Sequence, residues 1–386
     1  MTSYNFLLSI AIILVFTKVF GYFSNKVNMP NVVGALVAGI VIGPSCLGLV
    51  SESEFLSMAS EIGVILLMFT AGMETDTNEL RKNSVACIVI AMIGVIVPLI
   101  GGAACYYFYF EPGSTSYTDI LKAVFVGVVL TATSVSITVE ALREMGKLEG
   151  KVGSSILGAA VIDDIIGIIV LTIVMSLKDT SVSLYEVFLK IGLFGIFILI
   201  LGYCLTSLKG RIDMQAKKQR ASTYSIAACF LIAYITETVF GVADITGAYL
   251  LGLFLSQHDI KGEVTKNAGK LSTFFFSPVF FASVGLKVVL SGITLDLVIF
   301  SAILLIVAVL TKIVGCGLGA KACKYTWDES IKVGVGMISR GEVALIVAQK
   351  GFSIGLIDSY MFPPIIIVVI ATTIITPIML KKLFKA

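Results

Sequence analysis

The chain has 386 residues, of which 57% are hydrophobic and only 14% charged, and its mean hydropathy is +1.01. A soluble domain usually carries about 25% charged residues, so this composition excludes an ordinary soluble protein and indicates a membrane protein. The net charge of +3 is small, so the distribution of the charges is more informative than their sum.

Apolar segments follow one another along the whole chain. A helical span needs about 20 apolar residues, so these segments predict an all-α polytopic protein with about thirteen spans and no soluble regulatory domain. The first segment is expected to be a span rather than a removed signal peptide, because no basic region or cleavage site accompanies it. The segments are 5–23, 31–50, 55–72, 84–108, 118–145, 152–176, 184–207, 222–239, 241–256, 271–290, 293–319, 332–350 and 361–384.

Lysine and arginine gather in alternate loops, and this pattern predicts the orientation. One set of loops, near 26, 81–82, 143–151, 209–220, 261–270, 321–332 and 381–385, is rich in both residues. The opposite set holds only Lys178, Lys287 and Lys350. Cytoplasmic loops carry the excess of positive charge, so we expect a cytoplasmic C-terminus and, with an odd number of spans, an N-terminus outside.

An internal repeat is visible in the glycine pattern. Residues 32–44 read VVGALVAGIVIGP and residues 245–257 read ITGAYLLGLFLSQ, with matching small residues 213 positions apart. Gly72 and Gly285 match at the same shift. Seven spans separate the matched segments, so the halves have opposite orientations, which is typical of secondary transporters. The predicted organisation is a first repeat at 1–176, a linker span at 177–221 and a second repeat at 222–386.

The strongest chemical signal is the pair Asp163–Asp164 in the middle of the sixth span. A carboxylate at the bilayer centre costs about 2.5–3.5 kcal/mol, so two adjacent acids need partners or a function. Neighbours on a helix point about 100° apart, so one acid can face a partner helix while the other faces a cavity. A purely structural pair of acids, satisfied by salt bridges, is the alternative.

Lys312 is the predicted partner of this pair, because it lies in the middle of the span LLIVAVLTKIVGCG, too deep to reach the membrane surface easily. Arg340 and Glu342 in the twelfth span and Glu61 in the third are candidates for an ion-pair network inside the bundle. An interfacial lysine that extends to the surface is the alternative for Lys312.

Two spans contain polar breaks, at Thr131–Ser136 in the fifth and Ser339–Gly341 in the twelfth. Hydroxyl groups and freed carbonyls at such breaks can coordinate a small hard cation, although Ser and Thr also bond ordinarily to their own helix. Two broken helices that cross at mid-membrane expose charged helix ends. Lys312 and Arg340 are suited to balance C-terminal ends, and Glu342 an N-terminal end.

The sequence offers little for enzyme chemistry. The seven cysteines lack CxxC spacing and His258 is the only histidine, so we expect no zinc site, disulfide framework or cofactor. A nucleophile–base set and a phosphate loop are also missing, so an enzyme is not expected. His258 falls in a basic loop, where a solvated histidine is expected and a pH sensor is the alternative. Asp244 lies near the end of a span and is expected to be structural.

Several motifs together resemble the monovalent cation:proton antiporter superfamily, in its NapA/GerN-like bacterial branch. They are MPNVVGALVAGIVIGP, TATSVSITVEALREMG, AAVIDDIIGI, SPVFFASVGLK and ISRGEVALIVAQKG, and the resemblance covers nearly the whole chain. The resemblance implies a mobile core domain beside a dimerisation domain, a homodimer, and an elevator-like mechanism. Glutathione-gated potassium-efflux relatives typically have Gln-Asp in place of Asp-Asp.

The resemblance also implies the roles of individual residues. Asp164 corresponds to the essential acid that binds the cation and the proton, while Asp163 corresponds to the acid that pairs with the lysine at Lys312. Thr133 and Ser134 lie in the unwound segment near the ion, so Asp164, Thr133 and Ser134 are the expected sodium ligands.

The predicted function is exchange of Na⁺ (or Li⁺) for H⁺ across a bacterial cytoplasmic membrane, with two protons exchanged for one sodium ion and no nucleic-acid partner. A potassium/proton or mixed sodium/potassium exchanger stays open, because no ligand in the sequence separates these cations. An ion channel or membrane receptor is a further alternative, which the inverted repeat disfavours.

Overall fold

The computed structural model describes residues 5–27, 29–178, 183–214, 220–287 and 294–385, and every regular element in these ranges is a helix. Part of one basic loop (215–219) and the end of the predicted 271–290 span lie outside these ranges. In chain order the elements are α1 (Asn5–Lys26), α2 (Asn31–Ile42), α3 (Glu54–Glu74), α4 (Thr77–Lys82), α5 (Ser84–Phe110), α6 (Tyr117–Thr131), α7 (Val135–Glu144), α8 (Lys151–Lys178), α9 (Leu184–Ser207), α10 (Lys209–Asp213), α11 (Arg220–Phe240), α12 (Asp244–Leu255), α13 (Lys261–Leu271), η1 (Ser272–Phe276), α14 (Ser277–Leu286), α15 (Leu295–Ala322), α16 (Trp327–Gly336), α17 (Glu342–Ser353), η2 (Ser359–Met361) and α18 (Phe362–Lys385).

Within the described residues, ten helices are long and apolar enough to cross a membrane, and α2 and α12 are apolar but shorter. The protein is therefore an all-helical, multi-pass membrane protein, while the total of thirteen spans stays a prediction. Two boundaries differ from the expected ones by more than the others. The span expected at 31–50 is helical only to Ile42, because Gly43 and Pro44 end the helix. The span expected to begin at 271 continues a helix that starts at Lys261.

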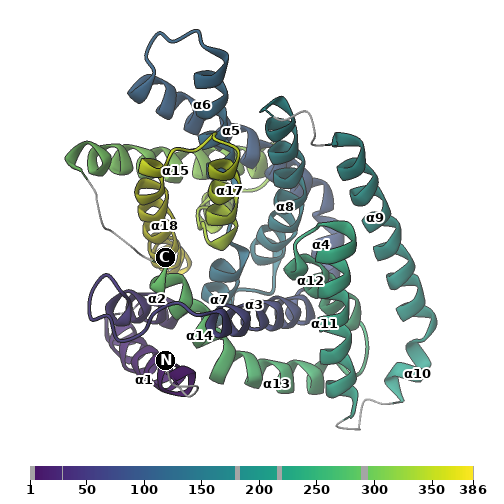
Figure 1. The fold of residues 1–386 in the computed structure, drawn as a ribbon. Helices are drawn as coiled ribbons and strands as arrows, with labels where there is room; N and C mark the ends of the chain where they lie inside the picture. The colour runs from purple at the N-terminus through teal and green to yellow at the C-terminus, as the bar shows by residue number, and fades with distance from the viewer. Residues whose placement is uncertain (1–4, 28, 179–182, 215–219, 288–293, 386) are drawn as a thin grey trace.

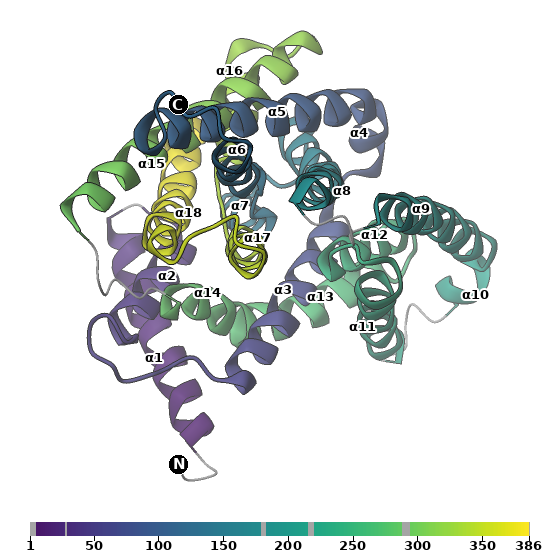
Figure 2. The same cartoon turned by 45° about the horizontal axis from the view of Figure 1, so that its top comes forward.

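The helices pack in two groups, which we name after α3 and α5. In the α3 group, α3 packs against α12 and α14, α2 packs against α1 and α14, and α11 packs against α12. In the α5 group, α5 packs against α6, α8 and α15, α15 packs against α16 and α18, and α18 packs against α7 and α17. Figure 2 shows α5, α15 and α16 at one end of the molecule and α1 and α3 toward the other.

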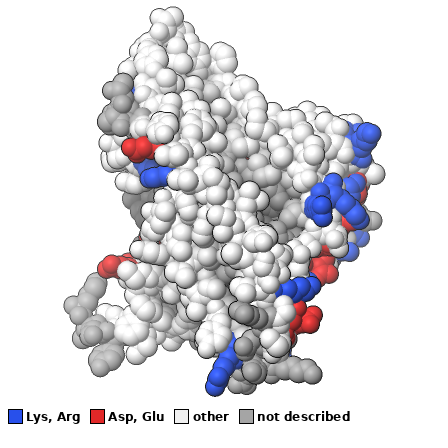
Figure 3. Space-filling model, turned by 90° about the vertical axis from the view of Figure 1, so that its right-hand side faces the viewer, with Lys and Arg blue, Asp and Glu red and all other residues white. Residues whose placement is uncertain are grey.

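Helix α9 stands at the periphery, beside α8, α11 and α12 (Figure 1). Only Phe194 is buried among its described side chains, although the helix is strongly apolar. Figure 3 shows this side of the molecule as a broad uncharged surface with charged side chains gathered at its edges. Apolar side chains that lack protein neighbours are expected where a helix faces lipid.

Four glycines allow pairs of helices in the α3 group to touch backbone to backbone. A Cβ added at Gly39 of α2 would lie 2.1 Å from the Ala282 oxygen of α14, and one at Gly252 of α12 would lie 2.2 Å from the Phe69 oxygen of α3. The two contacts are the same contact shifted by 213 positions. Gly72 against Tyr249 (2.1 Å) and Gly285 against Leu36 (2.4 Å) are related in the same way. This symmetry of contacts supports the proposed repeat.

We expect Gly72→Ala to destabilise the protein by about 1–3 kcal/mol, because the added methyl group meets a backbone oxygen that can move only with its helix. The measurement is thermal unfolding of the purified protein. Gly195→Ala in α9 is the matched control: its added Cβ has no neighbour within 4 Å, so the change should be neutral or stabilising. Equal unfolding temperatures for the two variants would disprove the close contact.

Candidate ion-binding site

Two helices are interrupted, as the sequence predicts, and the interruptions touch each other. Residues 132–134 separate α6 from α7, and residues 337–341 separate α16 from α17. The Ser134 N–H donates a hydrogen bond of 2.7 Å to the Ser339 oxygen. A Cβ at Gly341 would lie 2.6 Å from Ser134 Oγ, so glycine permits this close approach. The two breaks therefore form one structural unit.

Arg340 is buried inside this unit and connects its parts by hydrogen bonds. Its side chain is 1% exposed. The guanidinium donates to the backbone oxygens of Ile338 (2.6 Å), Leu130 (2.8 Å) and Ala308 (3.1 Å). Leu130 lies in the last turn of α6, whose final carbonyls have no partner within the helix. The positive charge thus lies where the broken helix ends carry partial negative charge, as expected for this residue.

Asp163 and Lys312 form a buried ion pair. The Lys312 amino group lies 3.2 and 3.3 Å from the two carboxylate oxygens, and the side chains are 0% and 1% exposed. The pair joins α8 to α15, two helices that pack on α5 in the α5 group. The predicted contact between these two residues is therefore present. Burial of both charges requires each to keep its partner.

Asp164 has a different environment from its neighbour. It is partly exposed, and it lines a cavity of about 370 Å³ between the two helix groups. The α5 group contributes α6, α8 and α17 to the wall, and the α3 group contributes α3, α11, α12 and α14. The adjacent acids thus differ as helix geometry predicts: Asp163 is buried and paired, while Asp164 is partly exposed to the cavity.

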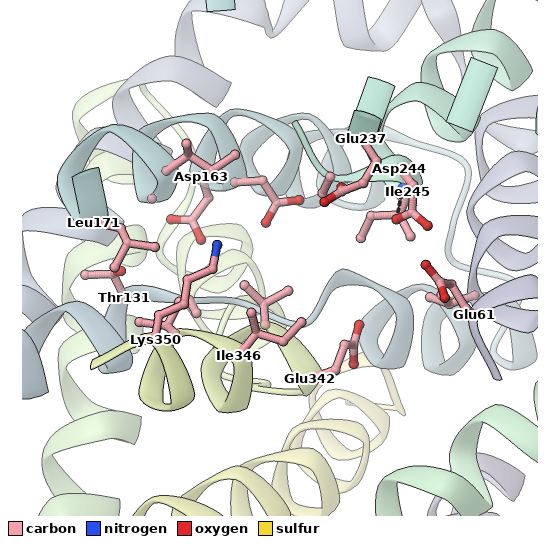
Figure 4. A pocket seen from close by; sticks show the side chains of 18 of the residues that line it. Glu61, Thr131, Asp163, Leu171, Glu237, Asp244, Ile245, Glu342, Ile346 and Lys350 are labelled. Carbon is pink, nitrogen blue, oxygen red and sulfur yellow. Dashed lines mark hydrogen bonds between the residues drawn. The ribbon is translucent and has the colours of Figure 1, made fainter. Parts of the chain in front are cut away.

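The cavity is acidic. Besides the two aspartates, it is lined by Glu61, Glu237, Asp244 and Glu342, against only two lysines, Lys287 and Lys350. Figure 4 shows Lys350 reaching in from α17, while Glu61, Glu237 and Asp244 gather at the other side. Glu342 is the first residue of α17, at the positive end of that helix. Carboxylates in this excess favour entry of a cation.

The hydroxyl groups expected to bind sodium are buried and are not among the residues that line the cavity. Thr133 and Ser134 are each 2% exposed, and neither hydroxyl has a hydrogen-bond partner of ordinary geometry among the described residues. Thr133 lies close enough to Asp163 to interact with its carboxylate. Thr131 and Ala132 line the cavity beside Asp164. The assignment of sodium ligands stays a prediction.

Two acids of the cavity lack a functional prediction from the sequence, and one histidine lies in a different environment from the predicted one. Glu237 was not singled out, and Asp244 was expected to be structural, yet both line the cavity. A signal for Asp244 was present, because it lies 213 positions after Asn31 and each begins a short helix. The prediction of a solvated His258 was wrong: it is 4% exposed, with Nδ1 3.3 Å from Asp213 Oδ1, because the turn after α12 packs against α10.

An exposed carboxylate beside a buried ion pair, at the contact of two interrupted helices in a membrane, is the architecture of an ion-coupled transporter. Comparison of the chain with known protein families agrees with this conclusion, because the family described as "Sodium/hydrogen exchanger, transmembrane" matches residues 11–386. The chain belongs to this family.

Its relatives are named as antiporters, which are transport proteins rather than enzymes. The chain is 40% identical to the Na⁺/H⁺-K⁺ antiporter GerN of Bacillus cereus over 386 residues, covering 100% of this chain and 97% of the relative. It is 35% identical to a Na⁺/H⁺ antiporter of Enterococcus hirae, covering 97% of both. The solved structure of the sodium proton antiporter MjNhaP1 from Methanocaldococcus jannaschii has the same fold, with a TM-score of 0.68 at 15% identity, covering 99% of this chain and 100% of that one.

Proposed function

We propose that this protein exchanges Na⁺ or Li⁺ for H⁺ and that Asp164 carries both ions in turn. The carrying observation is that both aspartates line the acidic cavity, but Asp163 is held by Lys312, whereas Asp164 forms no ion pair among the described residues. A cation and a proton compete for one carboxylate, because protonation removes the charge that binds the cation. Because each ion binds only after the other has left, the cation and the proton cross the membrane in opposite directions without direct contact between them.

The Asp163–Lys312 pair is proposed to determine the net charge that crosses the membrane in each exchange cycle. Sodium binding at Asp164 would draw Asp163 away from Lys312, which then releases a proton. Two protons would move for each sodium ion, so the exchange is electrogenic. The distance of 3.2 Å between the pair and its position beside Asp164 support this coupling.

The two helix groups are suited to an elevator-like movement, with the α5 group as the mobile core domain and the α3 group as the dimerisation domain of a homodimer. The cavity lies between the groups and reaches Ser57, Gly241 and Lys350 at the ends of helices that meet the loops poor in lysine and arginine. By the positive-inside rule this side faces outward from a bacterial cytoplasmic membrane, with the C-terminus in the cytoplasm. In this conformation Asp164 is accessible from outside.

Potassium is the second candidate cation. GerN of Bacillus cereus, 40% identical to this chain, is named as a Na⁺/H⁺-K⁺ antiporter. A site made of one carboxylate with hydroxyl and carbonyl oxygens accepts either ion, and its dimensions decide between them. A mixed sodium and potassium exchange is therefore the alternative within the same mechanism.

The test is a titration of Na⁺, Li⁺ and K⁺ in proteoliposomes that contain a pH-sensitive dye, with and without a membrane potential. We expect proton movement on addition of sodium or lithium and a rate that depends on the potential. Activity with potassium alone would favour the second candidate. Conductive cation flux without proton counter-movement would contradict exchange and indicate a channel.

A further inference from the structure

The last turn of α7 closes the side of the molecule opposite the cavity. Helix α7 is the half of the broken helix that points away from the cavity, and it packs against both α2 and α3. Helix α18 also packs against α2. These are contacts between the α5 group and the α3 group, so any relative movement of the groups must change them.

Glu144 caps a helix of the other group. Its Oε2 accepts the Asn31 N–H at 2.7 Å, and its Oε1 accepts the Val32 N–H at 3.1 Å. Asn31 is the first residue of α2, and the residue before it, Pro30, provides no side-chain cap. The free N–H groups and the positive end of α2 are thus satisfied by a carboxylate that lies 113 positions later in the chain.

Arg143, the adjacent residue, holds the other helix. Its Nε donates to Glu74 Oε2 at 2.8 Å, and its Nη2 donates to Thr70 Oγ1 at 2.8 Å. Both partners lie in the last two turns of α3. The guanidinium also contacts Glu140 one turn earlier on α7, at 3.2 Å. Successive residues on a helix point about 100° apart, so at the end of α7 Arg143 can contact α3 while Glu144 contacts α2.

We propose that Arg143 and Glu144 form a latch that holds the cytoplasmic side closed and that opens each time the α5 group moves. This inference rests on the alternating access proposed above. The contacts are polar, Glu144 is exposed and the Arg143–Glu74 pair is partly exposed, so water can replace the protein partners on release. The latch therefore favours the outward-open state without making it permanent.

If Glu144 is part of a latch, its removal should change hydrogen exchange at the cavity as well as at α2. If it only caps α2, its removal should change exchange at α2 alone. We expect Glu144→Ala to lower the ratio of outward-open to inward-open protein about fivefold, the usual contribution of a helix cap to an equilibrium. The measurement is hydrogen–deuterium exchange of the full chain in lipid nanodiscs. Exchange at residues 31–36 should rise, while exchange at the cavity-lining segments 57–64 and 164–171 should fall, because the cavity closes in the inward-open state.

Controls separate the latch from a loss of folding. Glu149→Ala removes an exposed acid from the loop after α7 and should change none of these segments. Glu74→Gln weakens the Arg143 grip from the α3 side and leaves α7 intact, so it should shift the same cavity segments as Glu144→Ala. Faster exchange at 31–36 with an unchanged cavity in both variants would overturn the latch. Sodium-driven proton movement by the unmodified chain is measured separately, so a failure of the proposed function is distinguishable.

Discussion

Asp164→Asn is expected to abolish sodium-driven proton movement, with a loss of at least about 100-fold in rate. The amide keeps the size of the side chain but removes both the proton site and the negative charge that offsets dehydration of the cation. The measurement is dye fluorescence in proteoliposomes with an imposed sodium gradient. Asp163, on the same helix, is paired with Lys312, and the other acids that line the cavity lie on other helices, so no neighbour should replace it.

Asp244→Asn is the matched control for this variant. It makes the same chemical change in the same cavity, at the first residue of α12. We expect exchange to continue, with a weaker apparent affinity for the cation because the cavity loses one negative charge. Sodium/proton exchange by Asp164→Asn would refute the carrier role, and equal loss in both variants would assign the ion to the whole acidic cavity.

Lys312→Gln is expected to leave exchange active but make it independent of the membrane potential. The variant removes the second proton carrier, so one proton would move for one sodium ion. It also leaves Asp163 without its partner, and breaking a buried pair typically costs about 3–5 kcal/mol. The rate is measured at several imposed potentials, and thermal unfolding is recorded on the same preparation.

Two further variants make this result interpretable. The double variant Asp163→Asn/Lys312→Gln removes both charges and should recover much of the lost stability. Lys350→Gln removes a cavity lysine that the structure does not pair with Asp163, and its exchange should stay voltage-sensitive. A voltage-dependent Lys312→Gln protein that is stably folded would refute the proposed stoichiometry.

The features that were predictable from the sequence are charged and polar residues inside apolar spans, because such residues are energetically costly in lipid. Neither an acid nor a lysine can be buried alone in an apolar span, so their positions indicated that Lys312 pairs with one of the two aspartates, and the family resemblance indicated that this one is Asp163. The polar breaks were visible for the same reason, and the structure shows that they touch directly through Ser134 and Ser339.

The features that were missed depend on how distant segments approach one another. Glu237 lies near a helix end, where an acid is inexpensive, and only the packing of α11 against α12 brings it to the cavity. Glu144 reads as a terminal acid of a helix, and its role as the cap of α2 is not encoded in local spacing. His258 reads as a loop residue because burial by α10 is a property of tertiary structure.

The paired glycine contacts have a consequence for how this sequence can change over generations. Gly39 and Gly285 join α2 to α14, and Gly72 and Gly252 join α3 to α12 in the same way. Since backbone atoms face each other at both crossings, a methyl group on one helix cannot be offset by shortening a side chain on the other. The two halves are thus free to diverge in their acids, lysines and loops, but each must keep its own glycines. These four positions lie outside the proposed ion site, yet they restrict changes in the sequence as firmly as Asp164, the proposed ion carrier.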